Sequence, residues 1–258
     1  GISAMHVDGA SQTLEYAFDD WCLAQMAYAL GYTEDYELFS ERAQNYRNLY
    51  DASTGFMRPR NKDGSWLAPF DPLTSHGWCE GNNWHYTWYV PHDIPGLTEL
   101  MGGNAACNEK LNDAFEKSAS MDFYTPRPQD ADTSVPYPTQ VNYGNEPGRY
   151  AAHVFDHAGA PWLTQKWARQ VRRQTFGKID PAGYCEDDDN GLAAATSVLL
   201  TLGFFDLKGG AELHPGYEIT APFFDKITIH LEETPYGENP FVIETLNSAT
   251  NNDYIQRA

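Results

Sequence analysis

Basic side chains are scarce in this sequence, and their scarcity excludes several classes of partner. The 258 residues contain 17 Lys and Arg against 36 Asp and Glu, which gives a formal net charge of −19. A field of that sign repels the phosphate backbone of nucleic acids and the anionic headgroups of lipid membranes. We therefore expect neither a nucleic acid nor a membrane surface as partner.

Long apolar runs and clustered cysteines are also missing. No run approaches the roughly 20 apolar residues of a membrane-spanning helix, and the opening residues lack the basic and apolar regions of a signal peptide. We expect both ends of the sequence to be internal points of a longer protein. No CxxC pair or Cys/His zinc motif occurs. We interpret the cysteines mostly as buried thiols, with one disulfide left open: Cys22, Cys79, Cys107 and Cys185.

Apolar and aromatic residues are abundant by contrast. At 41% hydrophobic and 14% aromatic content, the chain can bury a substantial core as one large domain or two smaller ones. An acidic, aromatic-rich protein suits neutral ligands rich in hydroxyls, because carboxylates accept hydrogen bonds from hydroxyls and aromatic rings stack on sugar faces. Carbohydrate is therefore the first ligand class to consider.

The spacing of apolar residues predicts a mainly helical body. Between Ser11 and Leu30 they recur every three or four residues, and Gly31 ends this helix. A second helix follows Thr33 as its N-cap, with acidic residues in its first turn, so the two helices form an antiparallel pair. Further helices are predicted over Pro95–Met101, Ala105–Lys117, Pro147–Ala158, Pro161–Phe176 and Leu192–Leu202.

Two regions depart from the helical pattern. Residues 51–93 are loop-like and aromatic, and long connections of this kind often carry function. After Gly209 the sequence changes to short β-like runs separated by turn residues. We therefore divide the chain into a helical catalytic portion, 1–208, and a C-terminal β-rich segment, 209–258. Helix pairs with long aromatic loops at one end favour an α/α toroid, without an internal repeat of fixed period to support it.

A run of four acidic residues, from Glu186 to Asp189, precedes the last predicted helix. The helix N-terminus offsets part of their mutual repulsion, and a bound divalent cation would offset more. The alternative is a solvated cap, in which Asp189 or Asn190 bonds the amides of the first turn. The residues alone leave both interpretations open.

A lone carboxyl, Glu80, lies between Trp78 and Trp84. Apolar walls favour the protonated form of a carboxyl and so create a proton donor. An ordinary surface glutamate is the alternative. A glycosidase needs two carboxyl functions on opposite sides of a sugar, and Glu80 together with the aspartates at 187–189 would supply them.

A third candidate segment contains Asn145 and Glu146, which follow Gly144 at the start of a predicted helix. Hard cations such as calcium accept mixed amide and carboxylate oxygens. The alternative is an ordinary capped helix entrance with Pro147 in the first turn.

Several ordered blocks together cover nearly the whole chain: TLEYAFDDWCLAQMA, TGFMRPR, PFDP, CEGNNWHYTWYVPHDIPGL, GNEPGRYAAHVFDHAGAPWLTQ, CEDDDNG, LGFFDL and FFDKITIHL. In these blocks and in their order the sequence resembles glycoside hydrolase family 92, whose members are calcium-dependent, inverting α-mannosidases. The resemblance implies a partial (α/α)6 toroid with a C-terminal β segment, preceded by an N-terminal β-sandwich domain. It also implies Ca²⁺, a mannose-containing oligosaccharide as substrate, and a secreted, periplasmic or cell-surface location. A calcium-dependent mannose-binding module without turnover, or an inactive fragment, is the alternative.

The resemblance also implies roles for individual residues. Glu80 matches the general acid, and Asp187 and Asp189 match the two aspartates from which the general base is drawn; we favour Asp189. The implied calcium ligands are Asn145, Glu146 and Asp189. Contacts with the sugar are implied for Asp20, Trp21, Arg58, Trp88, His92 and Glu146. One departure, GRYAAH after Pro147 where the family often has serine and paired histidine, bears on linkage preference.

Overall fold

The computed structural model describes residues 8–126, 136–177, 183–185, 188–232, 237, 239–247 and 252–258. In these residues the chain is mainly helical, as predicted, and its strands form two-stranded antiparallel pairs. Closure of the helices into a toroid stays a prediction. The helices are α1 (Gly9–Leu30), α2 (Thr33–Arg42), η2 (Ala43–Leu49), α3 (Asn83–Thr87), α4 (Ile94–Leu100), α5 (Asn104–Ser118), η3 (Ala119–Met121), η4 (Glu146–Gly148), η5 (Ala151–His153), α6 (Val154–His157), α7 (Pro161–Gln174) and α8 (Leu192–Leu202).

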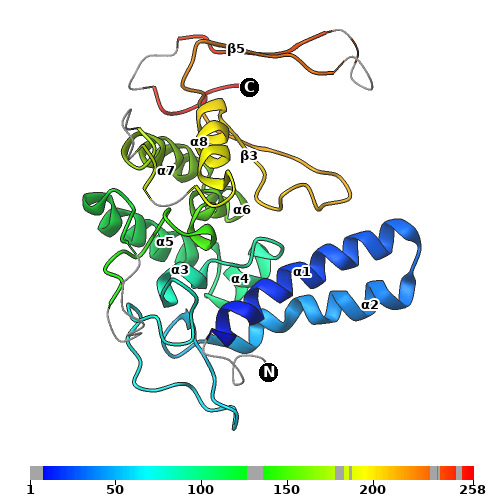
Figure 1. The fold of residues 1–258 in the computed structure, drawn as a ribbon, viewed down its shortest axis with the longest axis vertical. Coiled ribbons are helices and arrows are strands. Elements are labelled where there is room, and N and C mark those ends of the chain that lie inside the picture. The colour runs from blue at the N-terminus through cyan, green and yellow to red at the C-terminus, as the bar shows by residue number, and fades with distance from the viewer. Residues whose placement is uncertain are drawn as a thin grey trace.

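The first two helices form the predicted antiparallel hairpin, which projects from the body (Figure 1). Gly31 adopts a left-handed conformation with φ 78°, and its amide bonds to the Tyr28 carbonyl at 3.1 Å, so α1 ends where the glycine predicts. Thr33 is the first residue of α2 and not its cap, a shift of one residue. At the base of the hairpin, Arg42 Nε lies 2.9 Å from Asp20 Oδ2.

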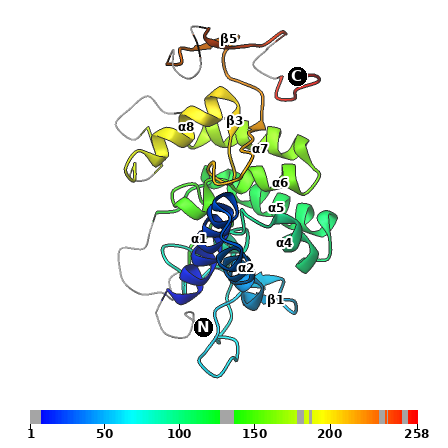
Figure 2. The same ribbon diagram turned by 90° about the vertical axis from the view of Figure 1, so that its right-hand side faces the viewer.

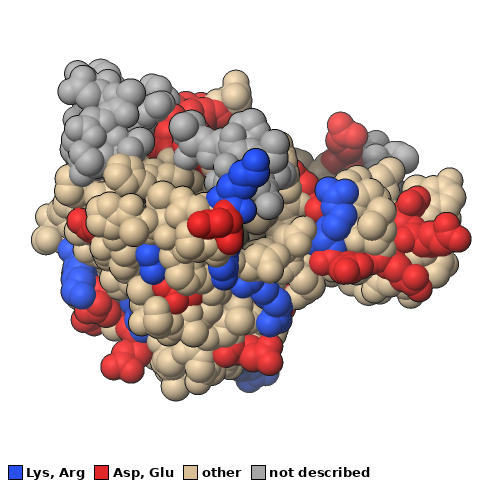
Figure 3. All heavy atoms as spheres, turned by 90° about the horizontal axis from the view of Figure 1, so that it is seen from below, with Lys and Arg blue, Asp and Glu red and all other residues tan. Residues whose placement is uncertain are grey.

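Acidic side chains gather on the surface of this hairpin (Figure 3). Glu34, Asp35 and Glu37 on α2 are all exposed. They contribute to the negative charge of the chain without entering its core, because charged groups keep their hydration at the surface.

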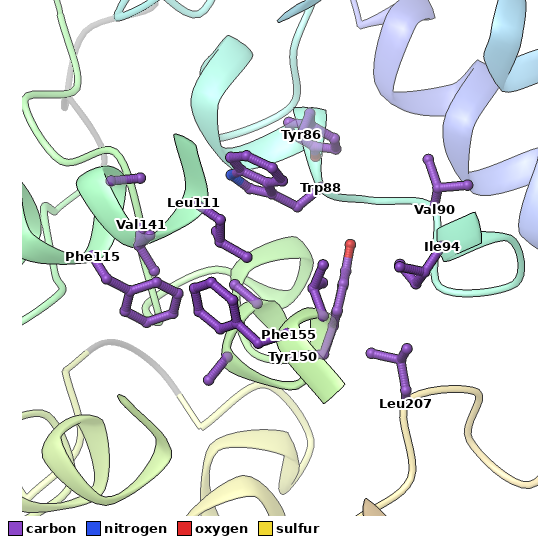
Figure 4. Close-up of a cluster of buried hydrophobic side chains, with 14 of the residues drawn as sticks. Tyr86, Trp88, Val90, Ile94, Leu111, Phe115, Val141, Tyr150, Phe155 and Leu207 are labelled. Atoms are coloured by element: carbon purple, nitrogen blue, oxygen red, sulfur yellow. The ribbon is translucent and has the colours of Figure 1, made fainter. Parts of the chain in front are cut away.

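Most of the core lies between α3 and α7 (Figures 1 and 2). Figure 4 shows side chains from α3, α4, α5 and α6 converging there, Phe115 of α5 among them. Trp88, which follows α3, and Tyr150, which precedes η5, join the same cluster. Phe115 of α5 stacks on Trp167 of α7 at a centroid distance of 5.1 Å. Fully burying one such side chain contributes about 2–3 kcal/mol, so this cluster fixes the positions of the loops that leave it.

The long aromatic region, 51–93, is more structured than the sequence predicts. It contains the short hairpin of β1 (Tyr50–Asp51) and β2 (Phe56–Met57), followed by α3. The α3 helix begins because Asn82 caps it, accepting a bond from the His85 amide at 3.0 Å. Five residues are too few for the apolar periodicity that reveals a helix in a sequence.

The helix predicted over Pro147–Ala158 is wrong as one element. The structure divides it into η4, η5 and α6. Asn145 caps η4 by accepting a bond from the Glu146 amide at 3.0 Å. The 3₁₀ turns that follow place buried residues toward the core at a spacing close to that of an α-helix, so the pattern alone does not distinguish them.

The C-terminal residues pack against α7 and α8. Here β3 (Phe204–Phe205) pairs with β4 (Glu218–Ile219), and β5 (Lys226–Ile229) pairs with β6 (Phe241–Glu244). Arg169 of α7 donates to the carbonyl of Pro222 at 2.8 Å, and its Nε lies 2.7 Å from Asp253 Oδ1. The β segment is therefore present, while the division at 208/209 stays a prediction that falls within the β3–β4 hairpin.

Two further properties follow from the described residues. None of the helices they form is both long and apolar enough to cross a membrane. All four cysteines belong to the described part of the chain, and no disulfide joins them.

Candidate active site

The loop that carries Glu80, residues 78–82, is held by three neighbouring parts of the chain. The Cys79 amide donates to Ser11 Oγ of α1 at 2.7 Å, and the Tyr86 hydroxyl of α3 donates to the Cys79 carbonyl at 2.8 Å. Asn145 Nδ2 donates to the Glu80 carbonyl at 3.1 Å. The backbone that presents Glu80 is therefore fixed on both sides.

The backbone of Glu80 adopts a left-handed conformation, with φ 51°. For a residue other than glycine this conformation costs on the order of 1–2 kcal/mol, and it persists only where the surroundings determine it. The next residue, Gly81, lies against Tyr86, and a Cβ on it would come within 2.9 Å of the ring. Because such strain concentrates at functional sites, its presence at Glu80 supports a functional role for this carboxyl.

The tryptophans on either side of Glu80 in the sequence pack on other aromatic residues. Trp78 is buried and stacks on Tyr86 at 4.9 Å with an interplanar angle of 17°. Trp84 packs edge-on against Phe56 at 4.7 Å. The Glu80 side chain itself is half-buried. That these two rings shield it from water stays a prediction.

Residues 145–149, the connecting segment, lie against the Glu80 loop and are themselves rigid. Gly148 touches the backbone of Asn142 so closely that a Cβ would lie 1.8 Å from the Asn142 carbonyl oxygen. Only glycine fits there without moving the backbone. The Arg149 amide donates to the Glu146 carbonyl at 3.1 Å, which closes the turn.

At its far end the connecting segment contacts Asp189. Arg149 Nη2 lies 3.3 Å from Asp189 Oδ2; the Arg149 side chain is 3% exposed and that of Asp189 is 37% exposed. Asn145 contacts the Glu80 loop at the other end. Five consecutive residues thus connect the backbone of Glu80 to the carboxylate of Asp189, the two residues that the sequence predicts to act as an acid–base pair.

Neighbouring residues of the acidic run before α8 make different contacts. Asp188 Oδ1 accepts a bond from the Ala194 amide at 2.9 Å, and the Asp188 carbonyl accepts one from the Ala193 amide at 3.1 Å. Asp188 therefore bonds two amides in the first turn of α8, a role that the sequence did not predict, while the Asp189 side chain contacts Arg149. The other predicted base, Asp187, lies outside the described residues.

A second group of carboxyls lies between α1 and the connecting segment. Burial raises the pKa of Glu15, and the negative charges of Asp19, Glu146 and Asp8 raise it further. Glu146 itself is exposed. The predicted sugar contact at Glu146 therefore lies next to an acidic face of α1 made of residues 15 and 19, which are four apart and share one side of the helix.

Asp20, Trp21 and His92 come together where α1 meets the loop after α3. The Trp21 and His92 rings lie 6.3 Å apart, and His92 Nε2 donates to the Ala43 carbonyl at 3.0 Å. Burial lowers the pKa of His92, so its ring is neutral near pH 7. Asp20 pairs with Arg42. The structure thus groups three of the predicted sugar contacts.

The remaining predicted sugar contacts, Arg58 and Trp88, are engaged inside the protein. Arg58 Nη1 lies 2.7 Å from Asp51 Oδ2, and its guanidinium stacks over Phe70 at 4.4 Å. Trp88 is 1% exposed and belongs to the core. A small hollow beside Arg58 is lined in part by His76 and Asn83. Contacts of Arg58 and Trp88 with a sugar stay predictions.

Comparison with known proteins decides the family. A model of the glycosyl hydrolase family 92 catalytic domain matches residues 2–258. The chain belongs to glycoside hydrolase family 92. The resemblance noted in the sequence is therefore confirmed.

Individual members of family 92 share both sequence and structure with this chain. An α-mannosidase of the family from Bacteroides thetaiotaomicron is 28% identical, with a TM-score of 0.78 over 95% of this chain and 30% of that one. A second enzyme of that bacterium, described as an inverting mannosidase, is 33% identical, with a TM-score of 0.75 over 93% of this chain and 32% of that one. The first has also been solved with mannoimidazole bound.

A fungal relative is similar to this chain over nearly the whole length of the chain. An uncharacterized secreted glycosidase of Arthroderma benhamiae is 27% identical over 274 residues, 96% of this chain and 32% of the relative. The chain thus spans about a third of the length of the relatives it matches.

The calcium ligands predicted for this family 92 chain are only partly assembled by the described residues. Asn145 Oδ1 accepts the Glu146 amide, and Asp189 Oδ2 contacts a cation, Arg149. The described residues contain no group of three His, Cys, Asp or Glu side chains placed to hold a metal ion. Asp187, the other carboxylate implied at this place, lies outside the described residues. Calcium binding stays a prediction.

Two residues of the candidate site, Arg149 and Glu15, do not stand out in the sequence. Arg149 belongs to the segment GRYAAH, which departs from the family pattern, although it is a basic residue four positions after Asn145. Glu15 and Asp19 were recognisable as an i, i+4 pair on one helix face. What the sequence did not reveal was that this face turns toward Glu146.

Proposed function

We propose that the protein containing this chain is a calcium-dependent exo-acting α-mannosidase, which hydrolyses terminal α-mannosides with inversion at the anomeric carbon. The observation that carries the proposal is the connecting segment, because it contacts the Glu80 loop through Asn145 and the Asp189 carboxylate through Arg149. Membership of family 92 supplies the reaction class.

The proposed reaction is a single displacement. Water attacks the anomeric carbon and passes a proton to Asp189, while the glycosidic C–O bond breaks and Glu80 donates its proton to the departing oxygen. Glu80 ends ionised and Asp189 ends protonated, so one proton exchange with solvent restores both groups. Attack on the face opposite the leaving group inverts the configuration.

The proposed substrate is a mannose-containing oligosaccharide. Asp20, Trp21 and His92 lie together near α1, where carboxylate oxygens and ring faces suit sugar hydroxyls and C–H faces. Glu146 lies on the connecting segment, beside the acidic face of α1. The mannoimidazole complex of a bacterial relative supports a mannose-sized ligand.

The proposal includes Ca²⁺ bound near the connecting segment and the acidic run before α8, with Asn145, Glu146 and Asp189 among its ligands. Calcium would bind the sugar hydroxyls and favour a conformation close to the transition state. It also includes an N-terminal β-sandwich domain as partner and a secreted, periplasmic or cell-surface location. A fungal relative that is named as secreted supports the location.

The test is a screen of α-linked mannobioses with added calcium and with a chelator. The proposal predicts release of mannose from at least one linkage, lost on chelation and restored by calcium. Binding of mannosides without turnover would identify a binding module instead. Full turnover after chelation would remove calcium from the proposal and leave the acid–base pair to be tested by mutation.

A further inference from the structure

Arg149 occupies an unusual environment for a guanidinium. Its side chain is 3% exposed, and its Nη2 lies 3.3 Å from Asp189 Oδ2. Among the described residues, neither Nε nor Nη1 has a hydrogen-bond partner. Burying a cation with one charged partner and two unbonded donors opposes folding, so the arrangement calls for a role other than stability.

The backbone of Arg149, from which its guanidinium extends, is held on both sides. Gly148, immediately before it, is locked against the Asn142 carbonyl, and the Arg149 amide bonds to Glu146. Immediately after it, Tyr150 is buried in the core and packs on Tyr89 at a centroid distance of 5.6 Å. The backbone is therefore fixed on both sides of Arg149, and its buried side chain has little room to follow a displaced Asp189.

Asp189, by contrast, lies in a strained turn. It adopts φ 48°, Asn190 adopts φ 59° and Gly191 adopts φ 95°, three left-handed residues in succession. The Ala193 and Ala194 amides at the start of α8 donate to Asp188, and the Leu192 amide donates to the backbone carbonyl of Asp189. Among the described residues, no capping bond therefore fixes the Asp189 side chain. Its only charged contact among the described residues is Arg149.

We propose that Arg149 is the positioning residue of the general base. It holds Asp189 through Oδ2, so that Oδ1 remains to accept the proton of the attacking water. This inference rests on the proposed function for the role of Asp189 as base. Arg149 touches neither the sugar nor the water, and it acts through the carboxylate alone.

Kinetics of Arg149 variants separate positioning from folding. Because the contact matters once water attacks, Arg149→Gln should lower kcat by about 100-fold and leave KM within about threefold, the pattern of an interaction used in the transition state. Arg149→Lys should recover part of kcat. Guanidinium at low millimolar concentration should raise kcat of Arg149→Ala but not of wild type.

Arg169→Gln is the matched control. Arg169 is also buried and also contacts one aspartate, Asp253, at 2.7 Å, but it lies on α7 and holds the C-terminal segment. Its loss should reduce stability without changing kcat of the folded protein. An Arg149→Gln variant that keeps wild-type kcat, or changes only KM, would overturn the inference.

A double-mutant cycle on the folding equilibrium tests the contact without any turnover. If Arg149 holds Asp189, the effects of the two substitutions should not be independent. The double variant Arg149→Gln/Asp189→Asn should change the folding equilibrium constant by a factor about three- to thirtyfold smaller than the product of the factors for the two single variants. If the factor for the double variant equals that product to within about twofold, the two residues are not coupled and the inference is overturned. If wild type hydrolyses no α-mannoside, the proposed function fails, and this cycle alone decides whether Arg149 positions Asp189.

Discussion

The two proposed catalytic carboxyls are held in opposite ways. Glu80 leaves a loop whose backbone is bonded by Ser11, Tyr86 and Asn145, three residues from three parts of the chain. Asp189 lies in an exposed turn, and its side chain is held by one buried cation. The acid is positioned through its backbone and the base through its side chain.

That difference suits the two chemical tasks proposed for these residues. An acid that protonates a leaving oxygen acts on an atom whose place is set by the bound sugar, so a rigid backbone suffices. A base that activates water must also orient a small, mobile molecule, and an additional contact on one carboxylate oxygen restricts which oxygen faces it. Substitutions at the two sites should therefore fail in different ways.

The largest effect should come from the two carboxyls themselves. Glu80→Gln should lower kcat/KM by about 10²–10⁴-fold on mannobioses but far less on activated aryl mannosides, because only the former need a proton on the leaving oxygen. Asp189→Asn should impair both substrates alike, because both need activated water. Comparison of the two substrate classes checks this, with Glu99→Gln on the surface of α4 as a control. Equal losses for Glu80→Gln on both classes would remove it as the acid.

The next largest effect should come from Gly148→Ala, a substitution within the connecting segment. The new methyl group would lie 1.8 Å from the Asn142 carbonyl oxygen, and backbone cannot move aside as a side chain can. Unfolding free energy should fall by about 3 kcal/mol. Chemical denaturation measures it, with Gly216→Ala, where a Cβ meets open space, as a control. Equal stability of the two variants would show that the connecting segment is not locked.

A pH effect should follow from His85, which supports the Glu80 loop from α3. Burial lowers its pKa to about 4, and its Nε2 donates to the Thr139 carbonyl at 2.9 Å. The unfolded chain takes up a proton near pH 6.5, before the folded protein does. Stability is therefore complete above pH 6.5 and falls by about 3 kcal/mol as pH drops to 4.

His85→Asn should remove that part of the pH dependence. Denaturation midpoints of variant and wild type between pH 7 and pH 4 would reveal the difference in slope. Parallel curves would mean that His85 is protonated in the folded protein as readily as in the unfolded chain.

The smallest effect should come from Ser11→Ala, which removes one bond from the backbone support of Glu80. The Cys79 amide would lose an acceptor at 2.7 Å. The cost should be about 1 kcal/mol of stability, with a several-fold fall in kcat as the loop loosens. Thermal unfolding and steady-state kinetics measure both, and Ser40→Ala on α2 is the control. A fall in stability with no change in kcat would separate the loop's folding from its catalytic role.

The sequence predicted the elements whose signals are local. The end of α1 at Gly31, the bounds of α7 and α8 within a few residues, and the C-terminal strands all follow from periodicity, glycine and turn residues. The series of 3₁₀ turns in 146–153 could not be predicted from periodicity, because the spacing of its buried residues resembles that of an α-helix. The sequence also does not predict which acidic residue bonds the first-turn amides of α8. Four consecutive carboxyls are available for these bonds, and tertiary contacts select one of them.

The sequence suggests some members of the candidate site, but not Arg149, Glu15 or the contacts that connect the members. Glu80, Glu146 and Asp189 followed from the family resemblance. That Asn145 reaches the Glu80 carbonyl and Arg149 reaches Asp189 depends on how closely Gly148 approaches Asn142, a distance that no sequence pattern encodes.

The central claim is that Glu80 and Asp189 act on opposite faces of one mannose. Proton NMR of the first mannose released from an α-mannoside, recorded faster than mutarotation, tests it most directly. If Asp189 activates water on the face opposite the leaving group, the β-anomer appears first. Initial release of the α-anomer would mean retention of configuration and a covalent intermediate, and would contradict the assignment of Asp189 as a base that activates water.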